Sequence, residues 1–314
     1  MRRYLLGKLG QAVFVIWAAY TFTFVLLYVL PANPVDLMFD PTQLDTISAA
    51  DKQAVAQHYG FDKPLYLQYL TRLLAAAHGD FGTSTQNGEP VWSAIAAVVP
   101  RTIALASAAL LIAVLIAFAV ALAASLTGSR WLANLLASLP PAAVSVPVFL
   151  IGLVALQLFS FQLAWFPPFG TAGLRTLILP ALTLAIPVSG PIAQLLAKNL
   201  ARELHAPYVT TSIAKGATRP WVLVRDVLKN ASLPALTIAG VTLGNLLAGA
   251  VIVETIYSRS GLGRLTETAV RTQDVPLVQG VVIFAALVFV LVNLAVDLVY
   301  PLVDPRLRAR ILAG

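Results

Sequence analysis

Long apolar runs separated by short polar segments dominate the chain. A helix needs about 20 mostly apolar residues to cross the hydrocarbon core of a bilayer, and six stretches meet that length. They cover residues 9–30, 100–126, 132–160, 177–200, 232–254 and 279–303. Lipid offers the backbone no hydrogen bonds, so only helices or closed barrels can span it, and these runs are far longer than barrel strands. The pattern therefore predicts an all-α polytopic membrane protein with six transmembrane helices.

Two regions follow from this pattern. Residues 1–99 are expected to hold the first transmembrane helix and an external segment, and residues 100–314 a core of five further helices with a polar loop at 198–231. The stretch between Arg130 and Arg175 has no charged residue at all. We interpret it as one span that ends in the aromatic, proline-rich sequence FQLAWFPPFG, because aromatic residues favour the membrane interface.

Composition agrees with a membrane protein. Of 314 residues, 59% are hydrophobic and 11% are charged, against roughly 25% charged residues in a soluble domain. The net charge of +7 does not indicate nucleic-acid binding, because the basic residues flank apolar runs, where membrane topology explains them. The chain has no cysteine, which excludes disulfides and thiolate metal sites. His58 and His78 lack the spacing of metal ligands, so we expect no bound metal.

The distribution of basic residues predicts the orientation. Lys and Arg in short loops are retained on the cytoplasmic side. Thirteen of the 21 lie in the N-terminal segment, the 127–131 turn, the 198–231 loop and the C-terminal tail: Arg2, Arg3, Lys8, Arg130, Lys198, Arg202, Lys215, Arg219, Arg225, Lys229, Arg306, Arg308 and Arg310. These segments, with both termini, are therefore expected to be cytoplasmic, and the acidic 31–99 segment external.

The external segment has a helical pattern of its own. Leu67, Leu70 and Leu74 repeat at helical spacing within KPLYLQYLTRLLAAAHG, and a second polar stretch, AADKQAVAQHYGF, precedes them. We expect two short amphipathic helices near the membrane surface. The glycine-bounded sequence GDFGTS then predicts a turn before the second span.

The 208–234 segment, YVTTSIAKGATRPWVLVRDVLKNASLP, is a basic interruption between two apolar spans. Gly216 predicts a bend between two short helices, and Thr218 can cap the second helix, which has Pro220 in its first turn. A residue without a side chain permits close approach by a partner, but Gly216 could equally be a simple helix terminator. Residue chemistry alone leaves both interpretations open.

The same segment resembles the cytoplasmic EAA loop of membrane subunits of ATP-binding-cassette importers, and more narrowly that of the dipeptide/oligopeptide/nickel group. The pattern Y-V-x-T-x-x-A-K-G is matched by Tyr208, Val209, Thr211, Ala214, Lys215 and Gly216, and Leu233 and Pro234 close the spacing. The eponymous Glu-Ala-Ala is replaced by Thr-Thr-Ser. MRRYLLGKL…LPANP, GDFGTS…PV and VETIYSRSGLGRL…DVPLVQG…NLAVDLVYPLVDPRLR extend the resemblance over nearly the whole chain, although SRSGLG departs from the usual Trp-Pro before Gly-x-Gly.

The resemblance implies partners and residue roles. It implies a bacterial inner-membrane permease of the type I importer fold, a second homologous permease subunit, two cytoplasmic ATP-binding subunits that hold ATP and Mg, and an external substrate-binding protein. The coupling residues would be Tyr208, Thr211, Ala214, Lys215, Gly216, Ala217 and Arg219. The binding-protein dock would include Asp45, Asp51, Asp62, Arg259, Gly261 and Gly263. Cargo would be di- or oligopeptides, or alternatively nickel chelates, metallophores, glutathione or opines.

Small and polar residues in the fifth span are candidates for the translocation pathway. They are Thr237, Gly240, Thr242, Gly244 and Asn245. Plain packing at a helix interface is the alternative for the glycines, and an amide such as that of Asn245 needs a partner or water inside the membrane. Prolines 141, 147, 180, 187 and 191 in the third and fourth spans are expected to bend those helices.

The residues disfavour two other classes. An ion-coupled carrier needs ionisable residues at mid-membrane, whereas Glu254 and Asp297 lie near span ends. An intramembrane hydrolase needs an embedded nucleophile and base, whereas all three histidines lie in loops. The chain also has no G-x-x-x-x-G-K-[ST] phosphate loop. We therefore expect a non-catalytic subunit that binds no cofactor of its own.

Overall fold

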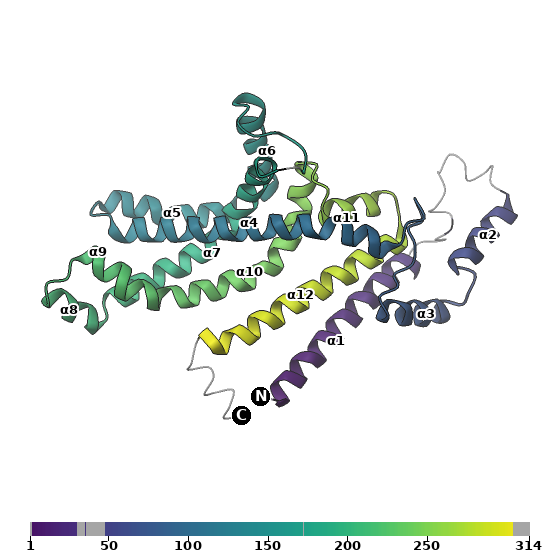
Figure 1. Ribbon diagram of the computed structural model, residues 1–314, viewed down its shortest axis with the longest axis horizontal. Coiled ribbons are helices and arrows are strands. Elements are labelled where there is room, and N and C mark those ends of the chain that lie inside the picture. Colours follow the sequence, from purple (N-terminus) through teal and green to yellow (C-terminus); the bar gives the residue numbers. More distant parts are fainter. Residues whose placement is uncertain (1, 30–34, 36–47, 172, 304–314) are drawn as a thin grey trace. The chain divides into compact units, whose positions relative to one another are not determined.

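The computed structural model describes residues 2–29, 35, 48–171 and 173–303, and its regular elements there are helices (Figure 1). They run α1 (Arg2–Phe24), η1 (Val25–Val29, a π-helical turn), α2 (Ala49–Tyr59), α3 (Leu65–Ala77), α4 (Val91–Leu126), α5 (Arg130–Ser145), α6 (Val148–Ala155), η3 (Leu156–Gln162), α7 (Arg175–Leu204), α8 (Pro207–Ala214), α9 (Arg219–Val222), η4 (Leu223–Val227), α10 (Leu228–Ile256), α11 (Leu262–Arg271) and α12 (Val275–Val303). The all-α prediction is confirmed for these residues.

Membrane-crossing length is reached by four of the described helices. They span Gly7–Tyr28, Val91–Leu126, Arg175–Leu204 and Val275–Ala295, and a fifth span results if the bent pair α5 and α6–η3 counts as one. Each overlaps a predicted span. Helix α10 covers the remaining predicted range with 29 residues, but the side chains at 243, 245 and 247 lie outside the described part. The number six therefore stays a prediction.

The third predicted span is not a single straight helix. Helices α5 and α6–η3 meet at an angle of 103°. The bend falls at Val146, whose backbone is extended (φ −89°, ψ 124°), directly before Pro147. A proline disfavours helical geometry in the residue before it, so this dipeptide ends α5 and starts α6. The predicted range 132–160 is thus broken at Pro147, one of the prolines expected to bend it.

The chain divides into two units, which we describe separately. The first contains residues 1–100 and 264–291, and the second residues 101–263 and 292–314. In the first unit, Tyr20 and Phe24 of α1 each pack edge-on against Tyr69 of α3. The centroid of the Tyr69 ring lies 5.3 Å from that of Tyr20 and 5.3 Å from that of Phe24. The Tyr20 hydroxyl also donates to the Tyr69 carbonyl oxygen at 2.9 Å.

The two predicted short helices of the external segment are α2 and α3. Helix α3 is amphipathic, whereas α2 has no segregated apolar face. Helix α3 packs through Tyr69, Leu73 and Ala76, and this leaves Leu70 and Leu74 exposed. An exposed leucine face on a helix packed beside a membrane span suits a helix at the lipid interface.

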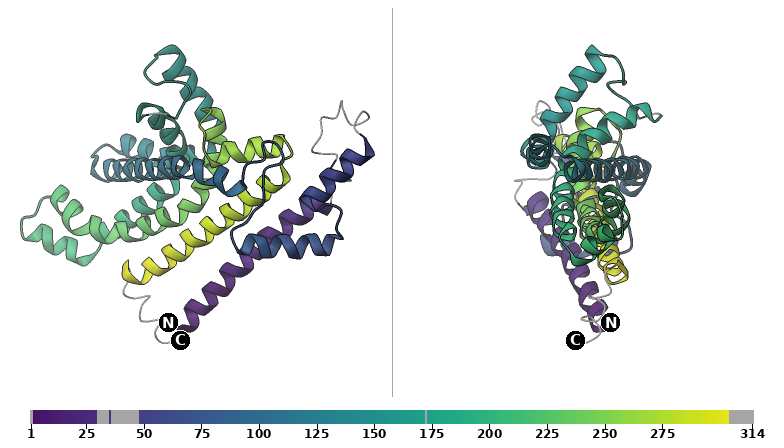
Figure 2. Two further views of the ribbon diagram at one scale, coloured as in Figure 1. Left: turned by 45° about the vertical axis from the view of Figure 1, so that its right-hand side comes forward. Right: turned by 90° about the vertical axis from the view of Figure 1, so that its left-hand side faces the viewer.

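In the second unit, α7 packs between α5 and α10, and α7 and α10 lie side by side (Figures 1 and 2). The helices approach closely at Gly190, where a Cβ atom would lie 2.7 Å from the Pro140 carbonyl oxygen, and at Gly249, where it would lie 2.7 Å from Leu184 Cδ1. Glycine is therefore required at Gly190, where a side chain would meet the backbone of α5, whereas at Gly249 it is the Leu184 side chain that fills the space.

Candidate functional site

The polar segment after α7 folds into two short helices separated by a glycine turn. Helix α8 starts with Pro207 in its first turn, where a missing N–H costs nothing, after the extended residue Ala206. Thr218 occupies the N-cap position of α9 with extended backbone (φ −74°, ψ 150°), but its side chain makes no capping hydrogen bond. The predicted helix–bend–helix is confirmed, and the predicted side-chain cap is wrong.

Gly216 forms the turn. Its φ of +91° lies in the region that residues with a side chain rarely adopt, and a Cβ atom there would meet nothing within 4 Å. Its N–H donates to the Ile213 carbonyl oxygen at 2.9 Å, and the Ala217 N–H donates to that of Ser212 at 3.2 Å, which closes the end of α8. The glycine is thus needed for its backbone conformation, and the space beside it is open to a partner.

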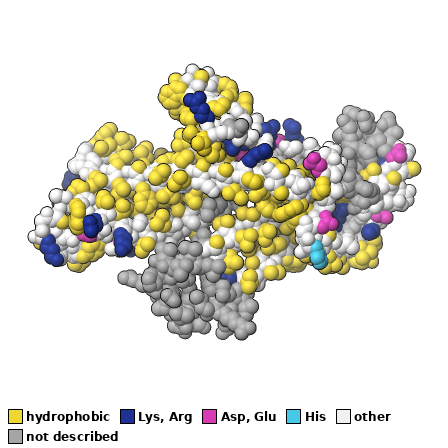
Figure 3. All heavy atoms as spheres, in the orientation of Figure 1, with side chains coloured by type: hydrophobic (Ala, Val, Ile, Leu, Met, Phe, Trp, Pro, Cys, Tyr) yellow, Lys and Arg dark blue, Asp and Glu magenta, His cyan; other side chains and the backbone are white. Residues whose placement is uncertain are grey.

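One face of the segment is buried against the helical core. Val209, Val222, Leu223 and Val227 are at most 5% exposed and join the cluster formed by Leu196 and Leu200 of α7 with alanines of α4 and α10. The opposite face carries most of the predicted coupling residues. Thr211, Ala214, Lys215, Gly216 and Arg219 are exposed, and Tyr208 and Ala217 are partly exposed. Figure 3 shows Lys and Arg side chains gathered over this end of the second unit.

Hydrogen bonds connect the segment to α7 and η4. The Tyr208 hydroxyl donates to Glu203 Oε2 on α7 at 3.0 Å, and the Ser212 hydroxyl donates to Asp226 Oδ2 on η4 at 3.1 Å. Burial, partly offset by a hydrogen bond from Asn230, raises the pKa of the Tyr208 phenol, and the Glu203 carboxylate raises it further. The phenol therefore stays protonated and remains a donor at neutral pH. The two hydrogen bonds connect α8 to the end of α7 and to η4.

The candidate pathway residues all lie on α10. Thr237, Gly240 and Thr242 are partly exposed and Gly244 is buried. The Thr242 hydroxyl donates to the Ala239 carbonyl oxygen of its own helix at 2.8 Å, which satisfies it without a ligand. Asn245 belongs to the helix, but its side chain lies outside the described part. A role in the pathway stays a prediction for these five residues.

The predicted dock residues are found in two different settings. Asp51 and Asp62 are exposed, and Asp51 accepts a hydrogen bond from the Ser48 hydroxyl at 2.7 Å at the start of α2. Asp45 lies outside the described residues.

Arg259 is only 4% exposed and donates to the Thr176 carbonyl oxygen at 2.8 Å. Burial, opposed by Glu254, lowers the pKa of this guanidinium. Gly261 and Gly263 are also buried, so these three residues shape their loop rather than present a surface.

The buried carboxylate of Glu254 organises that loop through contacts that the sequence pattern does not indicate. Glu254, 1% exposed, accepts a hydrogen bond from the Thr102 hydroxyl at 2.7 Å and another from the Gly263 N–H at 2.7 Å. The Leu262 N–H donates to Thr102 Oγ1 at 2.8 Å. We call Thr102, Glu254 and Gly261–Gly263 the Glu254 cluster. Glu254 was visible in the sequence as an acid at a span end, but nothing there indicated its partner 152 residues away.

Residues 110–309 match the family described as binding-protein-dependent transport system inner membrane component, and residues 1–106 match the N-terminal domain of such membrane components. The chain belongs to this family. It is a multi-pass inner-membrane permease subunit of an ATP-binding-cassette importer, a class that works with a substrate-binding protein and an ATPase.

Full-length relatives agree with this assignment. The chain is 32% identical over 311 residues to the glutathione transport system permease protein GsiC of Salmonella paratyphi A, with 98% of this chain and 99% of that protein covered. GsiC of Escherichia coli strain K12 is 31% identical over 311 residues with the same coverage. The resemblance drawn from the loop motif is thereby confirmed for the permease as a whole.

Proposed function

We propose that this permease forms half of a translocation pathway that imports di- or oligopeptides, glutathione included, by alternating access. A second homologous permease subunit supplies the other half, two cytoplasmic ATP-binding subunits hold ATP and Mg, and an external binding protein delivers the cargo. The chain itself is non-catalytic. It crosses the membrane six times, with both termini and the 198–231 loop in the cytoplasm.

The architecture of the 207–227 segment carries this proposal. Its buried valine and leucine face fixes it to α7 and α4, whereas the face with Ala214, Gly216 and Arg219 is open. Such a helix pair is a surface on which an ATPase can dock. Hydrogen bonds of Ser212 and Tyr208 connect α8 to η4, which leads into α10, and to the end of α7. Closure of the docked ATPases can therefore move the spanning helices.

The cargo is supported by relatedness rather than by a described site. The relatives at about one-third identity are glutathione permeases, and glutathione is a tripeptide with one unusual linkage. We therefore favour short peptides over nickel chelates, metallophores and opines, which the same architecture can carry.

Reconstitution tests both parts of the proposal. The chain, its partner permease, the two ATP-binding subunits and the binding protein are placed in liposomes, and ATP-dependent uptake of labelled trialanine, glutathione and a nickel–histidine chelate is compared. We expect uptake of a peptide and no ATP hydrolysis by the purified chain alone. Uptake of the nickel chelate alone would contradict the peptide assignment, and hydrolysis by the chain free of other subunits would contradict the non-catalytic role.

A further inference from the structure

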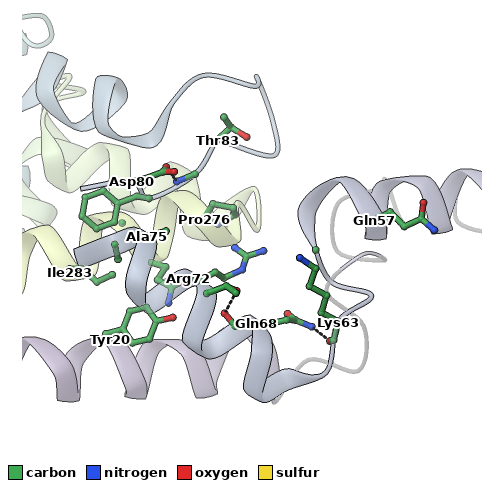
Figure 4. A pocket seen from close by; sticks show the side chains of 17 residues that line it. Tyr20, Gln57, Lys63, Gln68, Arg72, Ala75, Asp80, Thr83, Pro276 and Ile283 are labelled. Carbon is green, nitrogen blue, oxygen red and sulfur yellow. Dashed lines mark hydrogen bonds between the residues drawn. The ribbon is translucent and has the colours of Figure 1, made fainter. Parts of the chain in front are cut away.

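A cavity of about 370 Å³ lies within the first unit, between α3, the start of α12 and the 80–83 turn (Figure 4). Its volume lies in the range of small-molecule sites, roughly 300–1,000 Å³. The residues around it include several polar side chains from separate parts of the chain. They are Tyr20, Gln68, Thr71, Lys63, Arg72, Asp80 and Gln279.

Gln68 lines this cavity and carries a buried hydrogen-bond acceptor. Its Nε2 donates to the carbonyl oxygens of Phe61 at 3.2 Å and Lys63 at 2.7 Å. Because carbonyl oxygens only accept hydrogen bonds, the orientation of the amide group is fixed. Gln68 is 5% exposed, and among the described residues its Oε1 has no hydrogen-bond partner.

Gln279 adds the complementary donor. It lies in the second turn of α12, is 6% exposed, and its Nε2 has no acceptor among the described residues. Its side chain approaches the Tyr20 hydroxyl, but the contact lacks hydrogen-bond geometry. Leaving a buried donor or acceptor unsatisfied costs about 1–3 kcal/mol, so one cavity lined by both types of group points to a ligand that satisfies them.

Charges of both signs flank these two amides. The Arg72 guanidinium is held in place by a hydrogen bond to the Tyr28 hydroxyl at 2.7 Å and lies 4.8 Å from the centre of that ring. Lys63 contributes a second cation to the lining. The Asp80 carboxylate accepts the Gly82 N–H at 2.9 Å and supplies an anion to the lining.

We propose that this cavity binds a short free peptide. A peptide group offers one C=O and one N–H, which match the Gln279 donor and the Gln68 acceptor. The terminal carboxylate then faces Arg72 and Lys63, and the terminal ammonium faces Asp80. With the proposed topology, α3 and the 80–83 turn, which line the cavity, are external. The site uses no residue of the 207–227 segment or of α10, and a peptide can bind there without being transported.

Titration calorimetry on the full chain in nanodiscs, without any partner subunit, tests the site with trialanine as the probe. We expect saturable binding, and Gln279→Leu is expected to weaken it about tenfold, the effect of one lost hydrogen bond of roughly 1.4 kcal/mol. Because Gln279 Nε2 makes no hydrogen bond within the described part of the chain, this variant should fold normally. The same replacement at Gln53, which is exposed on α2 and outside the lining, is the matched control and should leave binding unchanged.

A change in the ligand tests Gln68 without touching its role in the fold. A depsipeptide analogue of trialanine, in which an ester oxygen replaces a peptide N–H, removes the group that Gln68 Oε1 accepts. It should bind the wild-type chain about tenfold more weakly. Absence of trialanine binding, or equal binding by wild type and Gln279→Leu, would overturn the proposal and leave a cavity filled by water. Since the titration involves no ATP and no uptake, its failure is distinct from a failure of the proposed import function.

Discussion

The backbone N–H of Gly263 donates a hydrogen bond to the buried carboxylate of Glu254 over 2.7 Å, across a turn in which neither Gly261 nor Gly263 has room for a side chain. A Cβ atom on Gly261 would lie 2.1 Å from Glu254 Oε1, and one on Gly263 would lie 2.3 Å from Val251 Cα. The Gly-x-Gly sequence is thus a packing requirement around a buried acid.

The Glu254 cluster can be tested by adding one methyl group. Gly261→Ala and Gly263→Ala should each destabilise the chain by about 1–3 kcal/mol, the usual range for overpacking, and lower the midpoint of thermal unfolding in detergent. Gly128→Ala is the control, because a Cβ there meets nothing within 4 Å. If all three variants melt together, the close contacts at Glu254 are not structurally important.

The hydrogen bond between Ser212 of α8 and Asp226 of η4 should affect coupling more than folding. Ser212→Ala removes the hydrogen bond to Asp226, and a partly exposed bond of this kind contributes about 0.5–1.5 kcal/mol. We expect normal membrane insertion and a reduced number of cargo molecules imported per ATP hydrolysed. Thr210→Ala, on an exposed position of the same helix, is the control. An unchanged transport ratio for Ser212→Ala would show that this contact transmits nothing.

Much of the helix pattern could be predicted, because membrane spans depend on local apolar composition. Pro147 is one of the prolines that the sequence marks as bending a span, but nothing in the uninterrupted apolar run indicates a bend as sharp as 103°. Thr102 and Glu254 could not be paired, because they are 152 residues apart and neither is unusual in its own surroundings. The same holds for Gly190, whose importance depends on the Pro140 carbonyl of another helix. Gly240 and Gly244 are predictable candidates for a helix interface, because two glycines four residues apart in one span are a local signal.

We predict the membrane orientation from the Lys and Arg distribution. Reporters fused after residue 80 and after residue 215 should report the external and the cytoplasmic side, respectively. The first position follows α3, and the second lies in the turn between α8 and α9. The reverse result, or both reporters on one side, would contradict the six-span topology.

Exposed acids in the external segment should contribute to docking of the binding protein. Asp62→Lys is the cleanest change, because Asp62 is exposed, whereas Asp51 also takes part in the start of α2. We expect weaker association at low salt and a smaller difference at high salt, since exposed charges are screened over about 10 Å at 0.1 M. Binding measured across a salt series decides this. Identical curves for wild type and Asp62→Lys would make this acid a solvated surface residue.

Coupling through the 207–227 segment is tested most directly at Ala214. This residue is exposed at the end of α8, next to the open space beside Gly216, so Ala214→Trp should fold and insert normally but obstruct a docked ATPase. The measurement is co-purification of the ATP-binding subunits together with substrate-stimulated ATP hydrolysis in the reconstituted complex. Our account predicts that the tryptophan variant loses most of both, whereas Thr210→Ala retains them. Wild-type association and wild-type stimulated hydrolysis in Ala214→Trp would contradict it and make the segment an interfacial linker.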